Sequence, residues 1–264
     1  TFEDMIFAGS ELGHNILGTK AALMRHDGDA IRRFIERTHT TDQMVFSTIG
    51  NLSLKAVQSV AERYFGQKEA TKRGFQRMKP AEVEPFEKMV TKHTHQTHCI
   101  VGARAYDIHA EKRLPLALLI NILGGPSANS RLNILLREKN GLSYNIEANY
   151  TPYNDCGMVA MYFSTDHHNL DLCRELIDKE LRELRTTRLS SRRMAMTKRQ
   201  FLAQMAISME NNEGYMLGAG KSFLVHDEID TLEEVYRKVS AVTAEQIMEV
   251  AEEIFSRTST LIYQ

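Results

Sequence analysis

Two side chains near the middle of the chain have the chemistry to stabilise a developing negative charge. Arg137 and Tyr144 lie seven residues apart, where a short charged helix is expected to give way to a strand. Gly141 can end that helix, because glycine tolerates the left-handed conformation that follows a helix C-terminus. A guanidinium and a phenol that converge on one point can both donate to a carbonyl oxygen that gains negative charge. Arg137 and Tyr144 are therefore the candidate site residues.

A purely structural alternative for these two residues stays open. Arg137 has Glu138 beside it and Glu147 further along the chain, and an ion pair with either would occupy the guanidinium. Tyr144 can equally be a core aromatic residue whose hydroxyl finds a partner inside the protein. On spacing alone the structural alternative is favoured, because functional sites are few in any chain.

The histidines His93, His95 and His98 form the most metal-like group in the sequence. On a strand, His93 and His95 would share one face, which is a workable pair of metal ligands. No carboxylate or thiolate follows at ligand spacing, and His98 would point the other way. We therefore interpret the segment as a polar edge or surface strand. His167 and His168 are interpreted as solvated residues at a helix start.

Two further motifs favour structural interpretations. Gly124 and Gly125 are not followed by the Gly-Lys-Ser/Thr of a phosphate-binding loop, so they are interpreted as a sharp turn between two helices. The methionines clustered between Met194 and Met216 favour packing inside helices over a peptide-binding groove.

The composition is that of an ordinary globular protein. The chain has 264 residues, of which 42% are apolar and 25% charged, and its net charge is −1. A near-neutral balance offers no electrostatic footprint for nucleic acid, and no apolar run is long enough to cross a bilayer. Three cysteines without Cys-x-x-Cys spacing predict buried free thiols and weakly favour a cytoplasmic location; they are Cys99, Cys156 and Cys173.

Helical periodicity is clear in several segments. Apolar residues recur at three- and four-residue steps over Leu52–Phe65, His168–Arg185 and the stretch from Ile247 to Ile254. Glu111–Leu123 is apolar almost all round and is expected to be buried between layers. Two helix starts carry capping boxes, Thr231 with Glu234 and Thr243 with Gln246.

Five short apolar runs bounded by turn residues predict strands. A turn over Tyr153–Gly157 predicts that the third and fourth pair as a hairpin. The five runs are Met44–Ile49, Thr97–Ala105, Ser143–Thr151, Met158–Ser164 and Thr258–Tyr263.

The segment 67–88 differs from the rest because it is charged, holds two prolines and lacks periodicity, so it is the predicted linker. It separates residues 1–66 from residues 89–264. A helix–strand unit ends each side, which is consistent with two copies of one α+β unit. We predict an α+β fold with helices packed on an antiparallel or mixed sheet.

The region around Arg137 also carries a family resemblance. It is similar to the second domain of the M16 zinc metallopeptidases, the family of pitrilysin, insulinase and mitochondrial processing peptidase. The matching motifs are Gly124-Gly125, Ser130-Arg131-Leu132, Leu136-Arg137-Glu138-Lys139, Gly141-Leu142-Ser143-Tyr144 and Thr165-Asp166. The passage from Phe2 to Thr19 resembles a later part of the first domain in that family.

The resemblance implies a duplicated metallopeptidase domain whose first copy, residues 1–66, is truncated here. In similar enzymes the residues matching Arg137 and Tyr144 contact the substrate backbone beside a zinc ion that the first domain binds. The chain contains no His-x-x-Glu-His, the inverted zinc motif of the family. The chain opens on Thr1 without an initiator methionine, so we expect it to derive from a longer parent that carries the zinc-binding segment. We expect zinc in that parent and none bound to this fragment.

Two functions follow as hypotheses. The parent is a zinc endopeptidase that acts on peptides or unfolded polypeptides, and this fragment alone is inactive. Alternatively, the parent is a non-catalytic partner subunit of such a protease and binds peptide without zinc. The resemblance also implies pairing, either as a homodimer or with a related M16 subunit.

Overall fold

A computed structural model describes all residues from 1 to 264, which divide into two compact units. The first, here called the sheet unit, comprises Thr1–Asn15, Lys79–Leu202 and Tyr236–Gln264. The second, here called the helical unit, comprises Ile16–Met78 and Ala203–Val235. Each unit therefore combines segments that are far apart in sequence.

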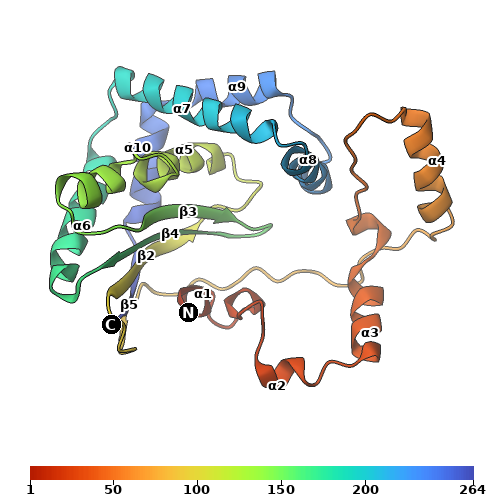
Figure 1. The fold of residues 1–264 in the computed structure, drawn as a ribbon, viewed down its shortest axis with the longest axis horizontal. Coiled ribbons are helices and arrows are strands. Elements are labelled where there is room, and N and C mark those ends of the chain that lie inside the picture. The colour runs from red at the N-terminus through yellow and green to blue at the C-terminus, as the bar shows by residue number, and fades with distance from the viewer. The chain divides into compact units, whose positions relative to one another are not determined.

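One five-stranded mixed sheet forms the centre of the sheet unit (Figure 1). The strand order is β1-β5-β2-β4-β3, in which β1 runs parallel to β5 and all other neighbours are antiparallel. The mixed sheet confirms the predicted α+β fold class. The strands are β1 (Glu87–Val90), β2 (Thr97–Ala105), β3 (Ile146–Pro152), β4 (Gly157–Thr165) and β5 (Ser259–Tyr263).

Three helices cover one face of this sheet: α5 (Arg113–Gly124), α6 (Leu170–Thr186) and α10 (Ala244–Phe255) (Figure 1). Their apolar side chains and those of the sheet form one large buried cluster. As predicted, α5 is buried almost all round, because it lies within this layer and contacts both β3 and α10. The predicted capping boxes at Thr231 and Thr243 are confirmed by their hydrogen bonds.

The other face of the sheet packs against a smaller cluster around α1 (Phe2–Ile6). The ring of Phe2 lies 5.7 Å from that of Phe86, and the guanidinium carbon of Arg104 lies 4.5 Å from the ring centre of Phe7. Apolar contacts therefore cover both faces of the sheet.

Shorter elements complete the sheet unit. They are the 3₁₀ turns η1 (Glu11–Gly13) and η4 (His167–Asn169) and the π-helical segment η3 (Asn133–Lys139). Two long helices, α7 (Ser191–Met209) and α9 (Leu232–Ala241), contribute residues to both units. No helix in the structure is both long and apolar enough to span a membrane.

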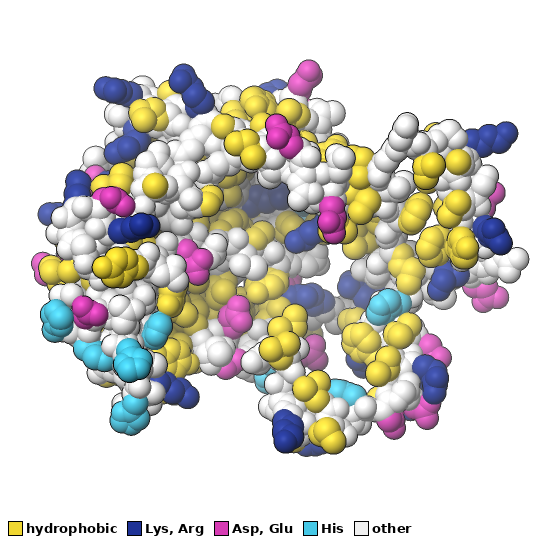
Figure 2. Space-filling model, in the orientation of Figure 1, with side chains coloured by type: hydrophobic (Ala, Val, Ile, Leu, Met, Phe, Trp, Pro, Cys, Tyr) yellow, Lys and Arg dark blue, Asp and Glu magenta, His cyan; other side chains and the backbone are white.

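The helical unit has no sheet and little buried apolar surface. Thr41 and Thr71 exchange hydrogen bonds of 2.7–3.0 Å, and Ser47 Oγ donates to the Met216 carbonyl at 2.8 Å. Apolar side chains gather on the surface over α3 and α4 (Figure 2). The elements are α2 (Lys20–Leu23), α3 (Gly28–Thr38), η2 (Thr41–Gln43), α4 (Leu54–Phe65) and α8 (Asn212–His226).

One predicted strand is wrong, and one strand of the structure was not predicted. Met44–Ile49 is not a strand, because no other segment pairs with its backbone as a neighbouring strand. Conversely, β1 lies where the predicted linker ends, and its Glu-Lys-Met-Val sequence carries no strand alternation. The other four predicted strands, the Tyr153–Gly157 hairpin turn and the predicted helices are confirmed within a few residues. The division into residues 1–66, 67–88 and 89–264 stays a prediction about domain organisation.

Candidate functional site

The π-helical segment η3 carries Arg137 close to its C-terminal end. Leu132 and Leu136 anchor the segment in the core, where their side chains are almost completely buried. After η3, Gly141 adopts a φ of 62°, and its N–H donates to the Arg137 carbonyl at 3.0 Å. Gly141 thus ends the helix in the left-handed conformation, as the sequence predicts. The turn directs the chain toward Tyr144.

Tyr144 lies in the short loop just before β3, and hydrogen bonds hold this loop in place. The buried hydroxyl of Thr165 donates to the Leu142 carbonyl at 2.7 Å, and Ser143 Oγ donates to the Asn145 carbonyl at 3.2 Å. Tyr144 itself is 84% exposed. The alternative that Tyr144 is a core aromatic residue is therefore wrong.

Arg137 and Tyr144 line the same open cleft of about 420 Å³. Its lining also includes the loop from Gly124 to Ser130 and the first residues of β3, from Ile146 to Asn149. Nε of Arg137 lies 3.6 Å from Oε1 of Glu138, and the arginine side chain is 53% exposed. This contact is the ion pair with Glu138 that the structural alternative predicts, whereas Glu147 is not paired with the guanidinium. The Arg137 guanidinium and the Tyr144 hydroxyl can therefore each donate a hydrogen bond to a ligand in the cleft.

The cleft runs along a free edge of the sheet, because β3 is the last strand. Ser164 N–H donates to the Asn145 carbonyl at 3.3 Å, which fixes the alternation of this antiparallel pair. The backbone groups of Ile146, Ala148 and Tyr150 consequently point away from β4. The cleft thus offers main-chain donors and acceptors as well as the two side chains.

Gly124 lets the loop and the edge strand approach each other closely. A Cβ atom on Gly124 would lie 2.6 Å from the Cβ and 2.7 Å from the backbone nitrogen of Ala148. The sequence predicts a turn at this glycine. The structure adds a steric reason, which is that any larger residue would collide with β3.

A comparison with known proteins decides the family. A family model described as the peptidase M16 inactive domain matches residues 27–201. The chain belongs to the M16 peptidase family. The resemblance seen around Arg137 is confirmed by this match.

Curated M16 relatives are longer than this chain. An uncharacterized zinc protease of Bacillus subtilis, YmxG, is 30% identical over 255 residues, which cover 97% of this chain and 62% of the relative. An uncharacterized zinc protease of Rickettsia felis is 26% identical over 260 residues, with 98% and 62% covered. The chain thus spans 62% of the length of both relatives.

Solved structures show the same fold. A peptidase M16 inactive domain from Pseudomonas fluorescens superposes with a TM-score of 0.86 at 16% identity, covering 99% of this chain and 63% of that one. A protease from Helicobacter pylori gives 0.81 at 15% identity, with 96% and 62% covered. At these identities the likeness concerns the fold alone.

The histidines of this M16 chain make structural contacts. The predicted polar edge strand is wrong: His93 lies in the loop between β1 and β2 with a φ of 49°, and β2, which begins at Thr97, is a largely buried strand between β5 and β4. Nδ1 of His98 lies 2.8 Å from the Tyr162 hydroxyl, and Nδ1 of His167 lies 2.8 Å from Thr97 Oγ1. His167 and His168 are exposed at a helix start, as predicted, and His167 also contacts Thr97. Within residues 1–264, no group of three or more potential ligand side chains is placed to hold a metal ion.

The cysteines are free and buried, as predicted. Burial raises the pKa of the Cys99 thiol to about 12 and also raises the pKa of Cys173. Neither thiol has the lowered pKa of a nucleophilic cysteine. Cys99 and Cys173 are therefore not candidate nucleophiles.

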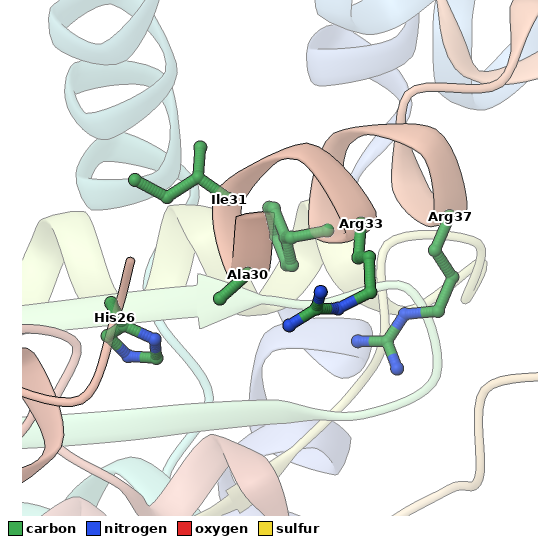
Figure 3. A pocket seen from close by; sticks show the side chains of 6 residues that line it. His26, Ala30, Ile31, Arg33 and Arg37 are labelled. Atoms are coloured by element: carbon green, nitrogen blue, oxygen red, sulfur yellow. The ribbon is translucent and has the colours of Figure 1, made fainter. Parts of the chain in front are cut away.

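A larger cavity of about 670 Å³ lies in the helical unit beside α3 (Figure 3). The guanidinium groups of Arg33 and Arg37 extend on one side of α3, and Ile31 points to the other (Figure 3). All of its lining residues fall between His26 and Arg37. No second element brings a chemical group to this cavity, so the β3 cleft is the better candidate site.

Proposed function

We propose that this chain is the part of a zinc-dependent endopeptidase that binds substrate and stabilises the transition state. The observation that carries the proposal is that Arg137 in η3 and Tyr144 in the loop before β3 line one open cleft. Curated relatives carry the name uncharacterized zinc protease, and this name supports the same class of activity.

The proposed chemistry uses only hydrogen bonding. When a peptide carbonyl is attacked, its oxygen gains negative charge, and preorganised donors lower the energy of that state. The Arg137 guanidinium supplies a charge-assisted donor, and the Tyr144 hydroxyl supplies a neutral one. Both donate toward the same oxygen, and neither has to transfer a proton.

Residues 1–264 do not fit a zinc ion, since no suitable group of ligands exists among them. A zinc site would have to come from a part of the parent outside this chain. There, zinc would polarise a water molecule and the scissile carbonyl. The role proposed for this chain is limited to binding and orienting the peptide.

Peptides or unfolded polypeptides are the proposed substrates. The cleft follows the free edge of β3, where the backbone groups of Ile146 and Ala148 point away from β4. An extended peptide is the ligand whose own backbone matches such a surface. A folded protein would not offer a free backbone of this kind.

The test is Arg137→Ala in the full-length protein, with cleavage of fluorescein-labelled casein as the readout. We expect kcat to fall on the order of 10²-fold, as for the loss of one oxyanion donor. Arg192→Ala is the matched control, because Arg192 is an exposed arginine of the same unit that does not line the cleft. Unchanged kcat and KM in Arg137→Ala would reject the proposed role.

The alternative of a non-catalytic partner subunit predicts a different outcome. Full-length protein that lacks His-x-x-Glu-His would bind casein without cleaving it and would hold no stoichiometric zinc. Upstream sequence and elemental analysis of the full-length protein separate the two functions.

A further inference from the structure

A half-hidden charge cluster joins the helical segment of Arg137 to α6. Nε of Arg131 forms an ion pair with Oε1 of Glu180, and its terminal nitrogen lies 2.6 Å from Oε1 of Glu183. The side chains of Arg131 and Glu180 are only 16% and 12% exposed, whereas Glu183 is 52% exposed. Of the two carboxylates, Glu180 is therefore the one that is largely shielded from solvent.

Positive charge is needed around Glu180. Its Oε1 atom is buried, and its polar contact is the ion pair with the Arg131 guanidinium. Burial raises the pKa of this carboxyl, and the charges of Arg131, Arg193 and Lys139 oppose that rise, with Arg131 first. These three cations come from both ends of the η3 stretch and from α7.

The position of Arg131 gives the pair its significance. Arg131 opens the helical stretch that continues through η3, six residues before Arg137. Leu132 and Leu136 hold this stretch in the core by apolar contacts. The π-helical geometry of η3 lacks the regular i to i−4 ladder. A directional ion pair at one end adds a restraint on the position of this irregular segment.

Stability alone is a weak reason for such a pair. Removing two charges from water costs about as much as their attraction returns, and apolar replacements are often neutral or stabilising. The best-attested use of buried charge pairs is to fix a register. Arg131 and Glu180 are placed for that use.

We propose that Arg131 and Glu180 are positioning residues that set where the Arg137 guanidinium stands relative to Tyr144. This inference rests on the proposed function of Arg137. It adds that the geometry of the cleft is fixed by α6, through an ion pair that does not line the cleft. Neither Arg131 nor Glu180 needs to touch the substrate.

The first measurement tests position without requiring activity. In full-length protein labelled with ¹⁵N-arginine, the Nε–Hε resonance of Arg137 is assigned by its loss in Arg137→Ala. Arg131→Met and, independently, Glu180→Gln should shift or broaden this resonance and leave that of Arg192 unchanged. The control is Arg185→Met, which removes a different ion pair of α6, with Glu252 of α10. An Arg137 resonance unmoved in both test variants overturns the inference.

The second measurement is a double-mutant cycle on casein cleavage. Arg131→Met should lower kcat/KM between about 10-fold and 10²-fold, as a misplacement of about 1 Å would. In the Arg137→Ala background the same substitution should have no further effect. An equal loss in both backgrounds would show a general structural role and reject the positioning role. If Arg137→Ala alone changes nothing, the proposed function fails, while the resonance still decides whether the pair positions Arg137.

Discussion

The sheet unit buries its large apolar side chains, whereas the helical unit leaves its own exposed. Every large, fully buried side chain belongs to the sheet unit, including Phe163, Leu119 and Ile177. No apolar side chain of the helical unit is buried, and Ile16 and Met24 are 99% and 79% exposed. The same kind of amphipathic sequence thus produces a closed core in one unit and an open apolar surface in the other.

This difference bears directly on the candidate site. Arg137 and Tyr144 belong to the sheet unit, where core residues and hydrogen bonds fix the segments that carry them. The α3 cavity belongs to the helical unit and is lined by α3 and by His26 just before it. A site that depends on convergent donors needs the rigid surroundings of the first unit.

The largest expected effect tests the contrast in core packing. Leu119→Ala, in the sheet unit, should lower the free energy of unfolding by about 2–5 kcal/mol, because it removes buried methyl groups and leaves a cavity. Ile31→Ala, on the 53% exposed position of α3, should change it by less than about 0.5 kcal/mol. Urea unfolding followed by circular dichroism measures both. Equal losses of unfolding free energy in the two variants would contradict the difference in core packing between the two units.

A glycine pair sharpens the comparison with a smaller effect. Gly124→Ala should cost about 1–3 kcal/mol, because the new Cβ collides with the backbone of Ala148. Gly218→Ala, within α8, should instead stabilise by about 0.4–1 kcal/mol, since a Cβ there meets nothing within 4 Å. Thermal unfolding of both variants gives the comparison. A Gly124→Ala protein as stable as the wild type would contradict the close approach at the cleft.

The smallest expected effect concerns pH. The Arg185 guanidinium lowers the pKa of Glu252 below its ordinary value of 4.5, so the unfolded chain binds this proton more readily than the folded one. The pair therefore stabilises the fold above pH 4.5, and this contribution is lost as the pH falls through the lowered value. Arg185→Met should flatten the acid side of the stability curve, measured by urea unfolding from pH 7 to pH 3. An unchanged slope would show that the pair does not link α6 to α10.

Helices were more predictable than strands for a physical reason. A helix satisfies its own backbone hydrogen bonds, so the pattern of Leu54–Phe65 gives a helix even where its apolar side chains stay exposed. A strand needs a neighbour, and Met44–Ile49 has none. The same dependence hides β1, whose partner β5 lies about 170 residues further along the chain.

The sequence predicts that Arg137 and Tyr144 lie close together, but it does not predict what holds them in place. Both residues line one cleft, on either side of the turn at Gly141, and their functional role stays a prediction. The attachments to Glu180 and to Thr165 come from segments that follow later in the chain. No local sequence pattern predicts such contacts, because the two partners come together only when the chain folds.

The most direct test of the account is the turnover number of the full-length protein carrying Tyr144→Phe. This change removes one hydroxyl from an 84% exposed side chain, so the stability should not change. The account predicts a fall in kcat on the order of 10²-fold with little change in KM. A kcat equal to that of the wild type would contradict the proposal that the cleft stabilises the transition state.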